Sequence, residues 1–214
     1  IQQYATGKWA LDLHPDDIYW CTADPGWVTG TSYGMLAPWS NGVTQVIYEG
    51  GYRASAWYEV IQKYKVTVWY TAPTAVRMLM KAGAEIPAKF DLSSLRHINS
   101  VGEPLNPEAI VWGLPVFKQA IHDNWWQTET GGIMISPLPG ATAQKPGSAT
   151  RPLPGIMPAL VDADGTELEG AVSGNLIIKD SWPGQMRTVY GDHDRFIETY
   201  FKTYPGNYFT GDGC

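Results

Sequence analysis

Cysteine is scarce in this chain of 214 residues, which contains only Cys21 and Cys214. Two cysteines cannot build the disulfide framework of small secreted domains, so we expect a reducing, cytoplasmic location. The four histidines and two cysteines lack the spacing of metal ligands, and a zinc site is therefore not expected. The sequence also lacks a Gly-x-Ser-x-Gly elbow and a Walker-type phosphate loop, which disfavours a nucleophilic hydrolase.

Runs of lysine or arginine are absent as well, and the net charge is −6. Proteins that bind nucleic acid or anionic membranes normally carry a basic patch. No apolar run is long enough to span a bilayer, and residues 1–4 do not resemble a signal peptide. We therefore predict neither a nucleic-acid partner nor a membrane partner, and the sequence does not indicate an oligomeric state.

The residues that are present favour a folded α/β protein, since 44% are hydrophobic and only 17% are charged. Strand-like runs at 18–22, 43–48, 66–70 and 97–101 alternate with helical patterns, which predicts a mainly parallel sheet with flanking helices. Beyond residue 140, Pro- and Gly-rich turns separate short apolar runs at 159–161 and 175–178. We predict an α/β subdomain over 1–139 and part of a β-rich subdomain over 140–214.

Three helices are expected between the strands, and a short fourth one near residues 196–201. The first has a face predicted to be buried, formed by Trp57, Val60, Ile61 and Tyr64. The second begins at Pro73 and ends at Gly83. The third begins with Asn106 as its cap, and Pro115 is expected to end it.

The first stretch that suggests chemistry is Gly102, Glu103 and Pro104, directly after a predicted strand. Ligands of parallel sheets bind beyond the carboxyl ends of the strands. Glycine allows backbone to approach a ligand closely, and proline stops the strand. An ordinary turn explains the same three residues equally well.

The second stretch, residues 122–132, combines two carboxylates, two amides, hydroxyl groups and two indoles before a glycine pair. Thr128 and Glu129 suit a phosphate group and its magnesium ion, because hydroxyls bind phosphoryl oxygens and hard cations prefer carboxylates. The structural alternative is that the tandem tryptophans belong to the core and that residues 128–130 form a helix cap. The density of polar groups favours function.

The third stretch is an aromatic strand, residues 208–212, that ends in Gly211 and Asp212. A carboxylate in this position can accept hydrogen bonds from the two hydroxyls of a ribose. Taken alone, an aspartate in a turn is the better explanation.

Together and in this order, the three stretches resemble the adenylate-forming superfamily, and in detail they resemble its acetyl-CoA synthetases. Four further segments look like that family, at residues 19–30, 70–75, 147–152 and 181–185. The resemblance extends over nearly the whole chain. It implies the large N-terminal domain of an AMP-forming ligase that converts acetate and ATP to acetyl-AMP and then transfers the acetyl group to coenzyme A.

This resemblance implies ATP or AMP, Mg²⁺ and coenzyme A as cofactors, and it assigns residues to them. The implied nucleotide-binding residues are Gly102, Glu103, Pro104, Asp123, Asn124, Trp125, Trp126, Gln127, Thr128 and Asp212. Within this set, Asp212 would bind the ribose. Thr128 would contact phosphate and Glu129 would bind magnesium, so these two are the implied catalytic residues. Ala72 would lie along the pantetheine arm of coenzyme A.

The implied acyl pocket consists of Val28, Thr29, Val101 and Trp126. The indole of Trp126 fills volume that a longer acyl chain would need, which favours acetate. Propionate is harder to exclude, because one methylene in an apolar pocket is worth only about 1 to 3 kcal/mol. A propionyl-CoA or other short-chain acyl-CoA synthetase therefore stays open as an alternative.

The sequence departs from the family pattern at Asn124, where threonine or serine is usual, and at Thr31, where histidine is frequent. The family's phosphate loop is expected before Ile1, and its lysine-bearing C-terminal domain is expected after Cys214. We therefore expect an internal fragment that does not turn over acetate by itself. An inactive nucleotide-binding fragment remains an alternative. A Trp-rich carbohydrate-binding or glycoside-cleaving module is a remote one.

Overall fold

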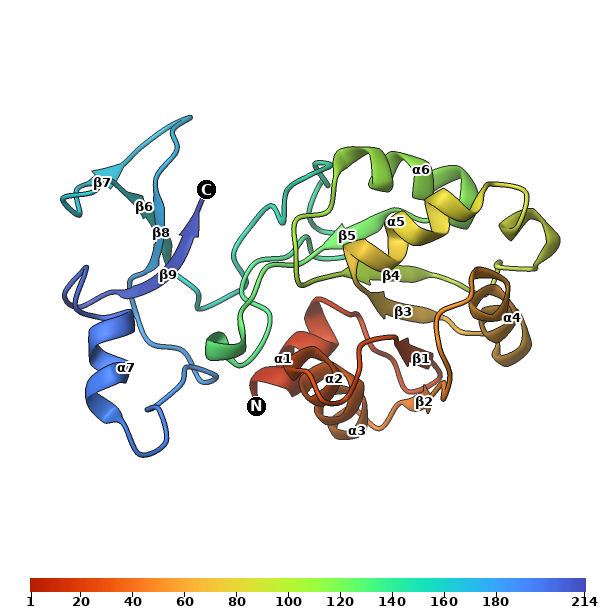
Figure 1. Ribbon diagram of the computed structural model, residues 1–214, viewed down its shortest axis with the longest axis horizontal. Helices are drawn as coiled ribbons and strands as arrows, with labels where there is room; N and C mark the ends of the chain where they lie inside the picture. The colour runs from red at the N-terminus through yellow and green to blue at the C-terminus, as the bar shows by residue number, and fades with distance from the viewer. The chain divides into compact units, whose positions relative to one another are not determined.

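Two separate sheets organise the chain in the computed structural model, which describes residues 1–214 (Figure 1). The chain divides into unit 1, Ile1–Arg151, and unit 2, Pro152–Cys214. The boundary predicted at residue 140 differs from this division. Residues 140–151 stay with unit 1 because Ser136 donates a backbone hydrogen bond to Arg151 at 3.0 Å and Gly147 packs against Pro107.

Unit 1 contains a five-stranded, entirely parallel sheet with the strand order β2-β1-β3-β4-β5. The strands are β1 (Ile18–Cys21), β2 (Thr44–Val46), β3 (Val68–Thr71), β4 (His97–Ser100) and β5 (Ile121–Asp123). The predicted fold class is confirmed. The expected strands match β1 to β4 with small differences at their ends, whereas the residue pattern did not predict a strand at β5.

Helices α4 (Ala54–Tyr64), α5 (Pro73–Ala82) and α6 (Pro107–Phe117) cover one face of this sheet (Figure 1). Their apolar sides pack on a core that includes Trp20, Trp57 and Trp69, whose rings lie 5.4 to 6.3 Å apart. Rings at these distances interact favourably beyond the area that they bury. Much of the tryptophan in this sequence therefore serves the core.

The opposite face is covered by α1 (Gln2–Trp9), α2 (Val28–Thr31), a π-helical turn η1 (Ser32–Leu36) and α3 (Ala37–Ser40). Strands β1, β3, β4 and β5 present polar and aromatic side chains on this side, and Tyr19, Tyr33, Tyr70 and Asn99 are buried there. This layer is therefore much more polar than the core between the sheet and helices α4, α5 and α6. A short 3₁₀ turn, η2 (Pro87–Lys89), completes the connection between α5 and β4.

Three helix details differ from the sequence-based expectation. Pro115 does not end α6, which continues to Phe117. The carbonyl group that Pro115 leaves without its helical partner belongs to Val111, an exposed residue that water can reach. Asn106 occupies the N-cap position of α6 without a capping hydrogen bond from its side chain, and Tyr64, expected on a buried face, is 47% exposed.

Unit 2 contains an antiparallel sheet with the order β7-β6-β8-β9. Its elements are β6 (Pro158–Val161), β7 (Glu167–Leu168), β8 (Asn175–Ile178), α7 (His193–Tyr200) and β9 (Tyr208–Gly213). Val161, Ile177 and Tyr204 form a small buried cluster on this sheet. The β-rich character predicted for the second part of the chain is thus present. Across the whole chain, no helix has the length and apolarity that a membrane span requires.

Candidate functional site

The candidate site of unit 1 is built from the segments that follow the carboxyl ends of its parallel strands. In this strand order, the direction of winding reverses between β1 and β3, and ligands of such sheets bind in the crevice at that point. Thr22 and Thr71, at the ends of these two strands, are joined by a hydrogen bond of 2.8 Å between their hydroxyl groups. Ala72 follows directly as the N-cap residue of α5.

Gly102, Glu103 and Pro104 follow β4, exposed at the same edge of the sheet. Gly102 has φ = +103°, a conformation that side chains with a Cβ rarely adopt. The Glu103 carboxylate is turned toward α5, where it accepts hydrogen bonds from the Thr74 amide at 3.0 Å and from Arg77 at 2.6 Å. The Thr74 hydroxyl donates to the same carboxylate. The side chain of Glu103 therefore fastens this segment to the beginning of α5.

The pKa of the Glu103 carboxyl lies below its ordinary value. Partial burial acts to raise this pKa, but the hydrogen bonds from Thr74 and Arg77 outweigh it. Glu103 is thus held as an anion at neutral pH, next to the N-terminus of α5, where a negative charge is favourable.

A buried polar cluster lies at the carboxyl ends of β4 and β5. The Asn124 amide donates to the Ser136 hydroxyl at 2.7 Å and lies 3.5 Å from the Asn99 amide oxygen. Four buried side-chain atoms of this cluster have no hydrogen-bond partner in the protein: Asn99 Nδ2, Ser100 Oγ, Asp123 Oδ1 and Asn124 Oδ1. Buried polar atoms without partners are costly, so their concentration at one sheet edge is typical of a binding site rather than of a core.

Asp123 is the most strongly perturbed carboxyl group of this cluster. Burial raises the pKa of Asp123 to about 7, against the opposing effect of the Leu105 and Asn124 backbone amides. The Leu105 amide lies 3.4 Å from Asp123 Oδ2. A carboxyl group that is partly protonated near neutral pH can both donate and accept hydrogen bonds. Perturbed carboxyl groups of this kind are concentrated at functional sites.

Trp125 and Trp126 follow β5 and have different surroundings. Trp125 is half-buried, and its backbone amide donates to Ile135 at 2.9 Å. The Trp126 indole is buried, donates its Nε1–H to the Tyr70 hydroxyl at 3.1 Å, and packs edge-on against Tyr33. Neither tyrosine was predicted as a site residue. The signals in the sequence were the position of Tyr70 near the end of a predicted strand and its place in the family-like segment 70–75.

Gln127 begins a 3₁₀ turn, η3 (Thr128–Thr130), in a capping box with Thr130. The helix-cap explanation of these residues is therefore present in the fold. The capping box does not use the side chain of Thr128, which is exposed, and Glu129 is only half-buried. Both side chains are accessible to a ligand at this edge.

The chain contains no group of three or more His, Cys, Asp or Glu side chains that could hold a metal ion. A site for Mg²⁺ does not need such a group, because this ion is usually bound by one or two carboxylates together with substrate phosphates. Glu129, which is half-buried in unit 1, is the carboxylate predicted for such a shared site.

The predicted acyl-binding residues come from three elements of unit 1. Val28 and Thr29 begin α2, and Val101 follows β4 with its backbone amide bonded to Thr71 at 3.1 Å. Tyr33, in the turn that continues α2, contacts Trp126. The helix that carries Val28 and Thr29 is thus connected to Trp126 through Tyr33.

Asp212 belongs to unit 2, where it lies near the end of β9 and is exposed. Its backbone amide donates to the Thr210 hydroxyl at 3.0 Å, and the preceding Gly211 has φ = +75°. This geometry presents the residue at the end of a strand, as predicted.

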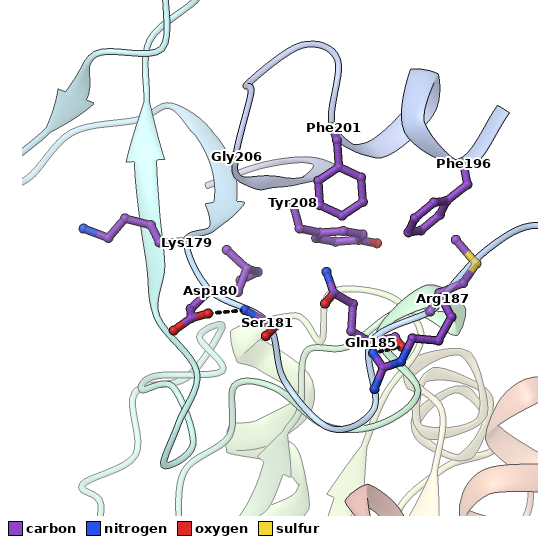
Figure 2. A pocket seen from close by; sticks show the side chains of 11 residues that line it. Lys179, Asp180, Ser181, Gln185, Arg187, Phe196, Phe201, Gly206 and Tyr208 are labelled. Atoms are coloured by element: carbon purple, nitrogen blue, oxygen red, sulfur yellow. Dashed lines mark hydrogen bonds between the residues drawn. The ribbon is translucent and has the colours of Figure 1, made fainter. Parts of the chain in front are cut away.

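Two pockets are formed by residues other than the predicted ones. In unit 2, a pocket of about 420 Å³ lies between the rings of Phe196, Phe201 and Tyr208 and the segment 178–187 (Figure 2). Arg187 donates to the backbone carbonyl of Gln185 at 2.8 Å within this segment. In unit 1, an apolar pocket of about 700 Å³ lies between residues 84–95 and the end of α6.

Comparison with known proteins was made by family, sequence and structure. The family model described as "AMP-binding enzyme" matches residues 1–190. An acetyl-coenzyme A synthetase of Xanthobacter autotrophicus is 60% identical over 215 residues, which cover 98% of this chain and 33% of that protein. The corresponding protein of Caulobacter vibrioides is 61% identical over 213 residues, which cover 96% of this chain and 33% of that protein.

Among solved structures, a Brucella canis acyl-CoA synthetase superposes with a TM-score of 0.88 at 35% sequence identity. The match covers 99% of this chain and 38% of the Brucella protein. This chain therefore spans about a third of the length of the curated relatives that it matches.

Proposed function

Because the chain belongs to the AMP-binding enzyme family, we propose that the whole protein is an AMP-forming acetate–CoA ligase. The relatives that match 96% to 98% of this chain at about 60% identity are acetyl-coenzyme A synthetases. The observation that carries the proposal at the level of the site is the buried polar cluster with its perturbed Asp123, which lies among the segments following the carboxyl ends of β4 and β5.

The proposed reaction has two steps. A carboxylate oxygen of acetate attacks the α-phosphorus of ATP, and pyrophosphate leaves with the electron pair of the broken bond. The coenzyme A thiolate then attacks the acyl carbon, and AMP leaves. Neither step needs a nucleophile from the protein, so the task of the site is to orient two anions and stabilise charge on the phosphoryl oxygens.

The residues of the nucleotide site are proposed to divide this work. Backbone at Gly102 to Pro104 flanks the adenine, since Glu103 itself is turned to α5. The strand end from Asp123 to Gln127 supplies polar groups to the base. Thr128 contacts phosphate, and Glu129 is the carboxylate for Mg²⁺, which would neutralise phosphate charge when bound.

Two proposed contacts concern the other groups of the reactants. Asp212 is proposed as the acceptor for the ribose hydroxyls, a role that its exposure in unit 2 permits. Ala72 is proposed to lie along the pantetheine arm of coenzyme A, and its small side chain leaves room at the N-terminus of α5.

Trp126 is proposed to limit the acid to acetate. The indole is held in a buried position, so the volume that it fills is not available to a longer chain. We predict that Trp126→Gly in the full-length protein shifts kcat/KM from acetate toward butyrate and longer acids. The change is measured as acid-dependent AMP formation over a series of chain lengths.

A second assay, the exchange of pyrophosphate into ATP, tests the function itself. Acetate-dependent exchange of pyrophosphate into ATP by the full-length protein is the expected result. The absence of this exchange with any short-chain acid would refute the proposed function. Exchange with an unchanged chain-length profile in Trp126→Gly would refute only the role of Trp126.

A further inference from the structure

Two buried tyrosines hold the Trp126 indole in a fixed place. Trp126 Nε1 lies 3.1 Å from the Tyr70 hydroxyl oxygen, which accepts its hydrogen. The Tyr33 ring packs edge-on against both partners, at 5.1 Å from Trp126 and 5.5 Å from Tyr70. Tyr33 and Tyr70 are completely buried. The three rings therefore form an aromatic triad, Tyr33–Tyr70–Trp126.

The triad is anchored to elements that are distant in the sequence. The Tyr33 hydroxyl accepts a hydrogen bond from the Ile133 backbone amide at 2.7 Å and lies 2.7 Å from the Thr6 hydroxyl. A Cβ on Gly132 would meet the same Tyr33 hydroxyl at 2.8 Å. Tyr33 also lies in the π-helical turn η1, a geometry that is rare and frequently found at functional sites. Its ring is thus fixed from several sides.

Tyr70 connects two parts of the sheet that are not neighbours. It lies on β3, one residue before the strand ends at Thr71, on the face of the sheet away from α4 to α6. Its hydroxyl group approaches the indole that follows β5, across the intervening strand β4. The hydrogen bond therefore connects β3, one of the two strands between which the winding reverses, with the indole that is proposed to limit the acyl chain.

We propose that Tyr70, supported by Tyr33, is a positioning residue that fixes the Trp126 indole and thereby sets the acyl chain length accepted. This inference rests on the proposed function. An indole can exclude a longer acid only if it cannot move aside when the acid enters. Loss of the Tyr70 hydroxyl would leave a buried N–H donor without its partner, and the indole would gain from moving to a place where the donor is hydrated.

The test is Tyr70→Phe in the full-length protein, which removes one oxygen atom and keeps the ring. We expect the ratio of kcat/KM for acetate to that for butyrate to fall by about tenfold. The KM for ATP should stay within about twofold, because neither Tyr33 nor Tyr70 is among the proposed nucleotide-binding residues. A purely structural role would lower kcat/KM for both acids equally and leave their ratio unchanged, which would overturn the inference.

Two further variants make the comparison specific. Tyr58→Phe removes the hydroxyl of another completely buried tyrosine. This residue packs in the core between the sheet and helices α4, α5 and α6, and its hydroxyl has no hydrogen-bond partner. It should leave the acid ratio unchanged. In a Trp126→Gly background, Tyr70→Phe should also leave the ratio unchanged, because the group that it positions is gone.

A measurement on the unsubstituted chain keeps the inference testable if Tyr70→Phe does not fold. The Trp126 indole N–H, assigned by ¹⁵N NMR with Trp126→Phe, should exchange with solvent far more slowly than the indoles of Trp27 and Trp39, which are 74% and 62% exposed. Equal exchange rates would overturn the inference. Absence of acetate-dependent activity in the unsubstituted full-length protein would instead refute the proposed function.

Discussion

At the scale of single residues, the polar layer of the unit 1 sheet contains two histidines in contact. The rings of His97 and His122 lie 4.4 Å apart, edge to face. His97 Nε2 lies 2.9 Å from the Ala10 carbonyl oxygen, and His122 Nδ1 lies 3.2 Å from that of Pro137. One nitrogen of each ring thus faces a backbone acceptor, whereas burial of the rings favours their neutral form.

These histidines should make the stability of the chain depend on pH. Burial, followed by the neighbouring His122, lowers the pKa of His97 from 6.5 to about 4, and burial also lowers the pKa of His122. Between pH 6.5 and about 4, His97 is protonated more in the unfolded chain than in the folded chain. Stability is therefore fully present above about pH 6.5 and is lost as the pH falls toward 4, by on the order of 3 kcal/mol for His97.

Urea denaturation of the chain between pH 4 and 8 measures this effect. His97→Gln, which keeps an N–H donor and cannot be protonated, should reduce the loss of stability on acidification. His14→Gln makes the same substitution at an exposed site and is the control for the substitution itself. A slope unaffected by His97→Gln would contradict the prediction.

At the scale of elements, one arginine joins three segments at the amino ends of the strands. Arg96, just before β4, contacts Asp17, just before β1, with 2.8 Å between Nε and Oδ1. It also contacts Asp12, in the segment after α1, with 2.6 Å between Nη1 and Oδ2. Asp17 is buried, and its pKa lies below the ordinary value because hydrogen bonds from Arg96 and Thr67 outweigh the effect of burial.

Arg96→Met should destabilise unit 1 by about 3 kcal/mol at pH 7, because it leaves the buried Asp17 carboxylate without its cation. The partial exposure of Arg96 places the expected loss at the lower end for such pairs. Urea denaturation measures it. Lys65→Met breaks the exposed pair with Asp91 and should cost far less, because solvent screens exposed pairs. Equal losses in the two variants would show that the Arg96 network has no special role.

At the scale of the whole molecule, the two units have cores of different size. The core of unit 1 includes the tryptophan cluster and the apolar sides of three helices, whereas a small cluster around Val161, Ile177 and Tyr204 lies in unit 2. Small units bury a smaller fraction of their surface and are correspondingly less stable. We therefore expect the β8 amides to open at a lower free energy than those of β3 and β4.

Native-state hydrogen exchange tests this prediction amide by amide. Ile177→Ala should lower the opening free energy of β6, β8 and β9 by about 2 to 4 kcal/mol. If the amides of β8 and β3 exchange only through one common opening in the unsubstituted chain, the two units do not differ in stability and the prediction is wrong.

Most of the parallel sheet and the family were predicted from the sequence alone. The alternation of strand and helical patterns predicted β1 to β4 and their flanking helices, because buried parallel strands are continuous apolar runs. It did not predict β5 or the continuation of α6 past Pro115. A short strand is defined by hydrogen bonds to its neighbours, which local sequence does not encode.

The roles of the predicted site residues stay predictions, but their surroundings are now described. The sequence by itself determined the fold class, the family and the three stretches predicted to form the site. Periodicity and motifs depend only on residues that are close together along the chain. Only the tertiary structure decided that Glu103 faces α5 and that Asp123 is buried with a raised pKa. It alone placed Tyr33 and Tyr70 against Trp126, since these contacts join residues separated by 56 positions or more.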